Sequence, residues 1–201
     1  MSRLVVFVGI SFLLATLGVA CDKPIDADND SAMQPSGDLA ETKIKDAEQA
    51  KAELVPDTLL VDEPNENHPV AAAAALFPPH ARAGELLTLV VQIKTAPRWH
   101  VYSTQALSGT GFSTTLKLQL APGVEAFGDW ICPPPHSGVG GQGPIYEGSV
   151  KFTRRLAIGR QMISGPINVT CKLGYQACDP FSCRPPETVA LKATAEIVQA
   201  P

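Results

Sequence analysis

The stretch that decides the fold is INVTCKLGYQAC, residues 167–178, in which apolar side chains fall on odd numbers. Because side chains alternate across a β-strand, this pattern predicts a strand with one buried face. Cys171 then points into the core together with Val169 and Leu173. Cys178 has the opposite parity, and it lies where the strand gives way to a proline-containing loop that ends at Cys183.

Other β-rich segments surround this one. They cover residues 87–93, 115–120, 146–158 and 188–198, and Gly- and Pro-containing turns separate them. Short period-2 runs at this spacing are typical of an antiparallel sandwich. No run of helical period intervenes, which argues against a βαβ architecture. We therefore predict an all-β antiparallel sandwich over residues 71–201.

The N-terminus has the pattern of an export signal. Arg3 precedes an uncharged, largely apolar run that ends at Ala20, and Cys21 follows small residues. This order resembles a bacterial lipoprotein signal, so we expect residues 1–20 to be a signal peptide and Cys21 to carry lipid. Ordinary signal cleavage and an uncleaved anchor are the alternatives. All three predict an exported protein of the periplasm or cell envelope, touching the membrane only through its anchor.

Charge divides the rest of the chain into two parts. Residues 22–70 hold 13 acidic residues and 4 lysines (net −9), whereas residues 71–201 hold 7 acidic and 11 basic residues (net +4). The acidic part lacks aromatic residues, so we expect residues 21–70 to form a flexible linker, with at most a transient helix over 39–54. The small positive excess of the second part does not indicate nucleic-acid binding.

The remaining four cysteines permit two pairs of different character. A Cys178–Cys183 bridge closes six residues and stabilises by ~2 kcal/mol, whereas a Cys132–Cys171 bridge closes 40 residues and stabilises by ~4 kcal/mol. A short, accessible bridge suits thiol–disulfide exchange, and a long one suits stability. We therefore predict that Cys178 and Cys183 are the redox pair and that Cys132–Cys171 is structural. Positive charge on Arg184 is expected to favour a Cys183 thiolate.

Two alternatives compete with exchange. Spacing alone favours a non-catalytic binding or scaffold lipoprotein in which both bridges are structural staples, because most disulfides of exported domains are structural. A zinc site formed by Cys132, His136, Cys178 and Cys183 is a weaker possibility. Since thiols pair in an oxidising compartment, we predict neither a metal nor a cofactor.

Four segments resemble the N-terminal periplasmic domain of the thiol:disulfide interchange protein DsbD. They are YQACDPFSCRPPE (175–187), PRWHVYS (97–103), the turn LAPGV (120–124) before Trp130, and IYEG (145–148). The resemblance implies an immunoglobulin-like sandwich in which Cys178 and Cys183 exchange electrons and Cys183 forms the mixed disulfide. It also implies that Tyr102 packs near the pair, although an ordinary core role for this residue is an open alternative.

The resemblance further implies partners. Such domains accept electrons from a membrane electron transporter or thioredoxin-like donor and pass them to oxidised exported proteins, a chemistry also used in cytochrome c biogenesis. Two departures stand out. Residues 131–144 lack the aromatic and acidic residues of the family's shielding loop, and Cys132 and Cys171 are additions to its pattern. Because the sequence stops at Pro201, we expect the electron donor to be a separate protein.

Overall fold

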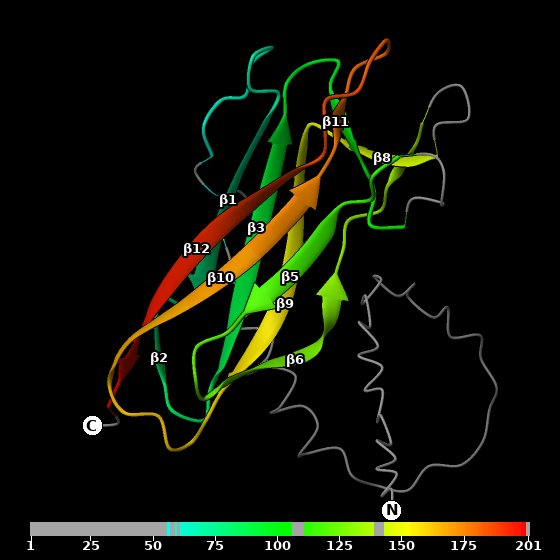
Figure 1. The fold of residues 1–201 in the computed structure, drawn as a ribbon. Coiled ribbons are helices and arrows are strands. Elements are labelled where there is room, and N and C mark those ends of the chain that lie inside the picture. The colour runs from blue at the N-terminus through cyan, green and yellow to red at the C-terminus, as the bar shows by residue number, and fades with distance from the viewer. Residues whose placement is uncertain (1–55, 57–58, 60, 106–110, 139–142, 200–201) are drawn as a thin grey trace, which may run out of the picture.

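The computed structural model describes residues 56, 59, 61–105, 111–138 and 143–199 (Figure 1). The predicted signal peptide, Cys21 and the helix-prone stretch 39–54 lie outside this part of the chain. Within it every regular element is a strand. None of these described residues forms a helix that could cross a membrane.

The first sheet of the sandwich has four antiparallel strands in the order β1-β3-β9-β6. They are β1 (Val70–Phe77), β3 (Leu86–Thr95), β9 (Ser149–Ile158) and β6 (Val124–Ile131). β1 consists mostly of alanine, which has little preference for strands. It nevertheless pairs with β3 along its whole length, because one face of this edge strand packs on the core through Leu76.

The second sheet has the order β2-β12-β10-β5 and packs face to face with the first (Figure 1). Its strands are β2 (His80–Arg82), β12 (Glu187–Val198), β10 (Gly165–Tyr175) and β5 (Thr115–Gln119). The β10 pairings are antiparallel, whereas the short β2 runs parallel to β12. The predicted immunoglobulin-like antiparallel sandwich is thus confirmed, with one parallel edge pairing added.

The core confirms the alternation seen in the sequence. Ile167, Val169, Cys171 and Leu173 of β10 are buried, and the residues between them are exposed or half-buried. They meet apolar side chains of β3 and β9, among which Phe152 is fully buried and packs edge to face on Tyr146 with ring centroids 5.3 Å apart. Burial of the inward faces of the strands holds the two sheets together, and the central strand β3 is buried on its outer face as well.

A third, smaller sheet lies at one end of the sandwich, where Figure 1 shows β11 and β8. Its order is β11-β4-β8-β7, with β11 (Ala177–Cys178), β4 (His100–Tyr102), β8 (Pro144–Glu147) and β7 (His136–Ser137). The sequence did not predict this sheet, because strands of two to four residues carry no readable period. Gly148, at a φ of 66°, ends β8 and splits the single run expected over 146–158.

The end of the expected linker contacts the domain. Arg184 donates hydrogen bonds to the carbonyls of Glu66 (2.6 Å) and Asn67 (2.8 Å), and Lys94 forms an ion pair with Glu63 (2.5 Å). The described residues 61–69 therefore pack on the sandwich before β1 begins at Val70.

Candidate functional site

The Cys178–Cys183 disulfide is present, with the two Cα atoms 4.0 Å apart. Cys178 ends β11 and is 1% exposed, whereas Cys183 lies in the following loop and is exposed. The pair therefore offers one accessible and one buried cysteine. An attacking thiolate reaches a sulfur along the S–S axis, so exposure decides which sulfur is attacked.

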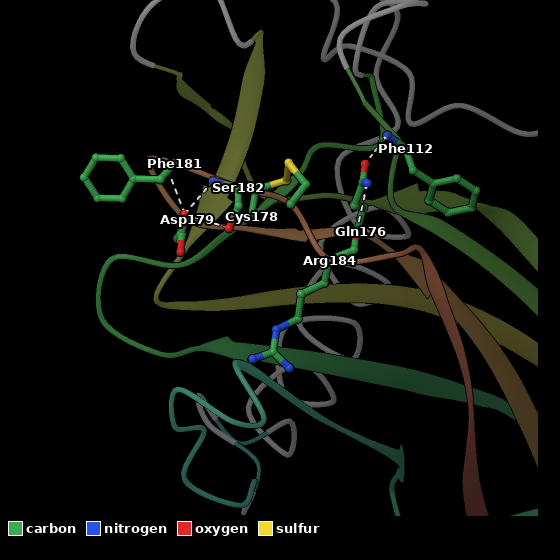
Figure 2. The surroundings of a disulfide bond; sticks show 8 residues. Phe112, Gln176, Cys178, Asp179, Phe181, Ser182 and Arg184 are labelled. Atoms are coloured by element: carbon green, nitrogen blue, oxygen red, sulfur yellow. Dashed lines mark hydrogen bonds between the residues drawn. A yellow bond between two sulfur atoms is a disulfide. The ribbon is translucent and has the colours of Figure 1, made fainter.

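The loop between the two cysteines is held by Asp179. Its carboxylate accepts hydrogen bonds from the backbone N–H groups of Phe181 (2.7 Å) and Ser182 (2.7 Å), and these bonds lower the pKa of Asp179 (Figure 2). The Asp179 N–H in turn donates to the Ser182 carbonyl (2.9 Å). Phe181, at the apex, points away from the disulfide and is 85% exposed. A fixed turn thus presents Cys183 to solvent.

Three residues of the third sheet and Cys183 of the neighbouring loop form one row of directly opposed positions. Cys183 opposes Cys178, Cys178 opposes His100 of β4, and His100 opposes Glu147 of β8. Directly opposed residues of antiparallel strands project their side chains from the same face of the sheet. The small sheet therefore aligns the redox pair, an imidazole and a carboxylate across neighbouring strands.

His100 is buried, with 4% of its surface exposed, and its Nε2 has no hydrogen-bond partner within the described part of the chain. Burial lowers the pKa of His100, and the charges of Glu147 and Asp179 oppose that effect. Buried polar atoms are almost always paired, so an unpaired one calls for an explanation. The sequence pattern predicted no role for His100 beyond its place in the PRWHVYS motif.

Tyr102 packs near the Cys178–Cys183 pair, as the resemblance to the DsbD domains implied. It is 5% exposed and shares a small buried cluster with Ile145 and Cys178. Its ring stands edge-on to His100, with centroids 5.9 Å apart. Gly111 lies against the ring, since a Cβ atom there would be 2.0 Å from it. Tyr102 and Ile145 thus give Cys178 an apolar environment.

Arg184 has a different setting from the one predicted. Its guanidinium carbon lies 5.0 Å from the ring centroid of Trp99, and two of its nitrogens donate to the 66–67 backbone. Figure 2 shows the side chain directed away from the disulfide. The expected role of Arg184 as the cation beside a Cys183 thiolate is wrong, because planar stacking and two carbonyl acceptors hold the group elsewhere.

Gln176 holds both sides of the loop that carries the disulfide, a role that the sequence pattern did not predict. Its Nε2 donates to the Arg184 carbonyl (3.0 Å), and its Oε1 accepts from the Phe112 N–H (3.1 Å), as Figure 2 shows. The Arg184 N–H also donates to the Ala177 carbonyl (2.8 Å). These bonds fix the return of the chain after Cys183.

The predicted Cys132–Cys171 disulfide is wrong, because Cys171 is a free thiol. Cys171 sits inside β10, where it opposes Leu118 of β5, and none of its surface is exposed. Cys132 follows β6 in the other sheet. Burial raises the pKa of the Cys171 thiol to about 12. This cysteine therefore behaves as a small apolar core residue.

The described residues contain no group of three or more His, Cys, Asp or Glu side chains placed to hold an ion. Cys178 and Cys183 bond to each other, and His136 is exposed on β7.

Comparison with known proteins identifies one family. The model of the family described as "Thiol:disulfide interchange protein DsbD, N-terminal" matches residues 66–195, well over half of the 201-residue chain. No curated protein matches the sequence. The matched range contains both bridged cysteines and all three sheets except the last three residues of β12.

Several solved structures are distantly similar to this chain. The N-terminal periplasmic domain of ScsB from Proteus mirabilis is 17% identical with a TM-score of 0.40, covering 61% of this chain and 44% of that one. The reduced DsbD N-terminal domain from Neisseria meningitidis is 14% identical (TM-score 0.35; 73% and 98% covered). A family 123 glycoside hydrolase from Clostridium perfringens is 9% identical (TM-score 0.37; 66% and 28% covered). Such distant likenesses carry no functional argument.

Proposed function

The chain belongs to the family of DsbD N-terminal domains, and on this premise we propose that its Cys178–Cys183 pair relays electrons by thiol–disulfide exchange. The donor is a thioredoxin-like or membrane electron-transfer protein, and the acceptor is an oxidised exported protein. The observation that carries the proposal is the asymmetry of the pair, with Cys183 exposed and Cys178 buried. An exposed sulfur receives the partner, and a buried one resolves the intermediate.

Loading of the domain takes two steps. A donor thiolate attacks the Sγ of Cys183, the S–S bond breaks, and Cys178 leaves as a thiolate that takes up a proton. The second donor thiol then attacks the donor-side sulfur of the mixed disulfide and releases Cys183. The donor is oxidised to a disulfide and the domain is reduced to a dithiol, so two electrons and two protons are transferred.

Unloading reverses the roles. The Cys183 thiolate attacks the disulfide of an exported acceptor, and Cys178 then attacks Cys183 to restore the bridge. The acceptor leaves as a dithiol. Rates depend on the thiolate fraction and on access to the attacked sulfur. The fixed turn around Asp179 supports this cycle by keeping Cys183 accessible.

Location follows from the same proposal. Because the family's exchange chemistry needs oxidised exported partners, we place residues 71–201 in the periplasm or cell envelope, after an export signal over 1–20 and an acidic tether over 21–70. Lipid on Cys21 would hold the domain at a membrane surface. Mass analysis of the mature N-terminus tests this step, and cleavage without lipid would contradict the anchor while leaving the exchange function untouched.

Trapping tests the exchange function itself. Cys178→Ala removes the resolving thiol, so it is expected to accumulate a discrete mixed disulfide through Cys183 in the envelope of the producing cell. Cys183→Ala is the matched control and should trap much less, since the remaining cysteine is buried. The bridge should also be reducible above about −300 mV, the limit typical of structural disulfides. A more negative potential with no trapped partner would instead support the binding or scaffold alternative.

A further inference from the structure

His100 is a buried histidine beside Cys178, the buried cysteine of the pair, and its imidazole is a candidate general base. It opposes Cys178 directly in the β4–β11 pairing, so the two side chains leave the same face of the third sheet. Its Nε2 is buried and unpaired within the described residues, although burial of an imidazole normally comes with a hydrogen bond. This nitrogen has spare capacity to accept a proton in the oxidised domain.

The groups around His100 keep it neutral yet able to take a proton. Glu147, on β8, opposes it directly, and Asp179 lies at the start of the redox loop. Tyr102, on its own strand, faces it edge-on, and Cys178 lies on the strand at its other side. Burial lowers the pKa of His100, while the two carboxylates raise it. A neutral imidazole whose cationic form is favoured by nearby carboxylates is suited to act as a base.

Cys178 needs such a base. It is 1% exposed and packs with Tyr102 and Ile145, so its thiolate is poorly solvated in the reduced domain. Burial of a thiol in apolar surroundings disfavours its thiolate, as the raised pKa of the buried Cys171 thiol illustrates elsewhere in the domain. Only the thiolate attacks a disulfide, so an unassisted Cys178 would resolve a mixed disulfide slowly near neutral pH.

We propose that His100 is the general base that accepts the Cys178 proton when Cys178 resolves a mixed disulfide on Cys183. The inference rests on the proposed exchange function and adds a residue to it. The proton moves from Cys178 Sγ to an imidazole nitrogen of His100, and the resulting thiolate attacks Cys183 Sγ. The Cys178–Cys183 bond forms, the bond to the acceptor breaks, and the acceptor leaves as a thiolate. The imidazolium, whose charge Glu147 stabilises, returns its proton to that thiolate or to solvent.

The row Cys183–Cys178–His100–Glu147 orders the participants as this step requires. The nucleophile, the base and a carboxylate occupy the successive strands β11, β4 and β8, and the attacked sulfur of Cys183 lies in the loop bridged to β11. A nucleophile next to a base, with a third group that stabilises the base, is the general arrangement for activating a weak nucleophile. An ordinary core histidine would instead have both ring nitrogens satisfied.

The test separates the two thiols in one experiment. The reduced domain is mixed with the aromatic disulfide DTNB, which releases one thionitrobenzoate when Cys183 attacks and a second when Cys178 resolves. His100→Gln should leave the first phase unchanged and slow the second by at least about tenfold near pH 7. The two proteins should converge as pH rises past the pKa of the Cys178 thiol, because no base is then needed.

His136→Gln is the matched control. His136 belongs to the same small sheet but is exposed on β7, and two strands, β4 and β8, separate it from the strand of Cys178. It should match the unmodified protein in both phases at every pH. An unchanged second phase in His100→Gln would overturn the inference. A missing first phase in the unmodified protein would instead contradict the proposed function, so the two failures are distinguishable.

A second measurement covers the case in which His100→Gln does not fold. In Cys183→Ala, with His100 retained, the imidazole is titrated by NMR and compared with the Cys178→Ala/Cys183→Ala double variant. If the two groups share a proton, removing the Cys178 thiol shifts the His100 titration. Identical titration curves would overturn the inference as well.

Discussion

Cys171 and Cys178 lie only seven positions apart on one segment, yet one is a free thiol and the other forms a disulfide. Cys171 lies inside β10, in the body of the sandwich, where only apolar side chains surround it and its thiol is free. Cys178 lies in β11 of the third sheet, bonded to an exposed partner and opposite His100. Both are fully buried, so burial does not separate them. What differs is the neighbouring polar groups and a chain reversal that brings a second sulfur within reach.

Alkylation of the reduced, folded protein gives the largest expected contrast. At pH 7 a thiol with a pKa of about 12 has a thiolate fraction about 10³-fold smaller than one with the unperturbed pKa of 9.0. Because Cys171 is fully buried with a raised thiol pKa and Cys183 is exposed, Cys183 should react with iodoacetamide at least about 10³-fold faster. Peptide mass spectrometry after timed quenching measures both rates. Equal rates would show that the interior of the sandwich opens as readily as the redox loop.

The next largest contrast is expected in the free energy of unfolding, which should depend more on the core of the sandwich than on the Cys178–Cys183 bridge. Phe152→Ala empties a fully buried site in the sandwich and is expected to lower the free energy of unfolding by about 3–5 kcal/mol. The double variant Cys178→Ala/Cys183→Ala removes the short bridge, worth ~2 kcal/mol at most. Urea unfolding of both variants measures the difference. A bridge variant as unstable as Phe152→Ala would mean that this disulfide is chiefly a staple.

The smallest expected effect lies at the junction between the regions. Tyr175 ends β10, its Oη donates to Glu187 (3.1 Å), and burial together with this carboxylate raises its pKa to about 12. A pKa raised by folding stabilises the protein below the unfolded value of about 10 and loses that stabilisation as pH rises through about 12. Ultraviolet titration of tyrosinate in Glu187→Gln should show a lower pKa for Tyr175. An unchanged titration would leave desolvation as its sole cause.

Local pattern predicted most of the sandwich. Alternation over 167–173 gave the buried face of β10 correctly, because one-sided burial imposes a period of two on any strand of that length. β1 was not predicted, since its alanines favour a strand only once β3 supplies partners for them. The third sheet was missed for a related reason, as its short strands are formed by pairing between distant segments.

Loop length alone did not predict the disulfide pairing correctly. Loop length correctly set Cys178–Cys183 apart, yet the same reasoning paired Cys132 with Cys171, whose thiol is free. Chain entropy ranks possible bridges but does not say which side chains meet. The prediction for Arg184 was wrong for a similar reason. Arg184 follows Cys183 in the sequence, but its long side chain is directed by Trp99 and by two backbone carbonyls.

The sequence by itself determined the long strands with alternating burial and the Cys178–Cys183 motif, because both depend on residues that are neighbours along the chain. The tertiary structure decided which cysteine is exposed and which groups surround the buried one. His100 and Glu147 are 47 positions apart, and only the pairing of β4 with β8 puts them in one row with Cys178. Reactivity depends on solvation and on the charges nearby, and these are properties of packing that no local pattern specifies.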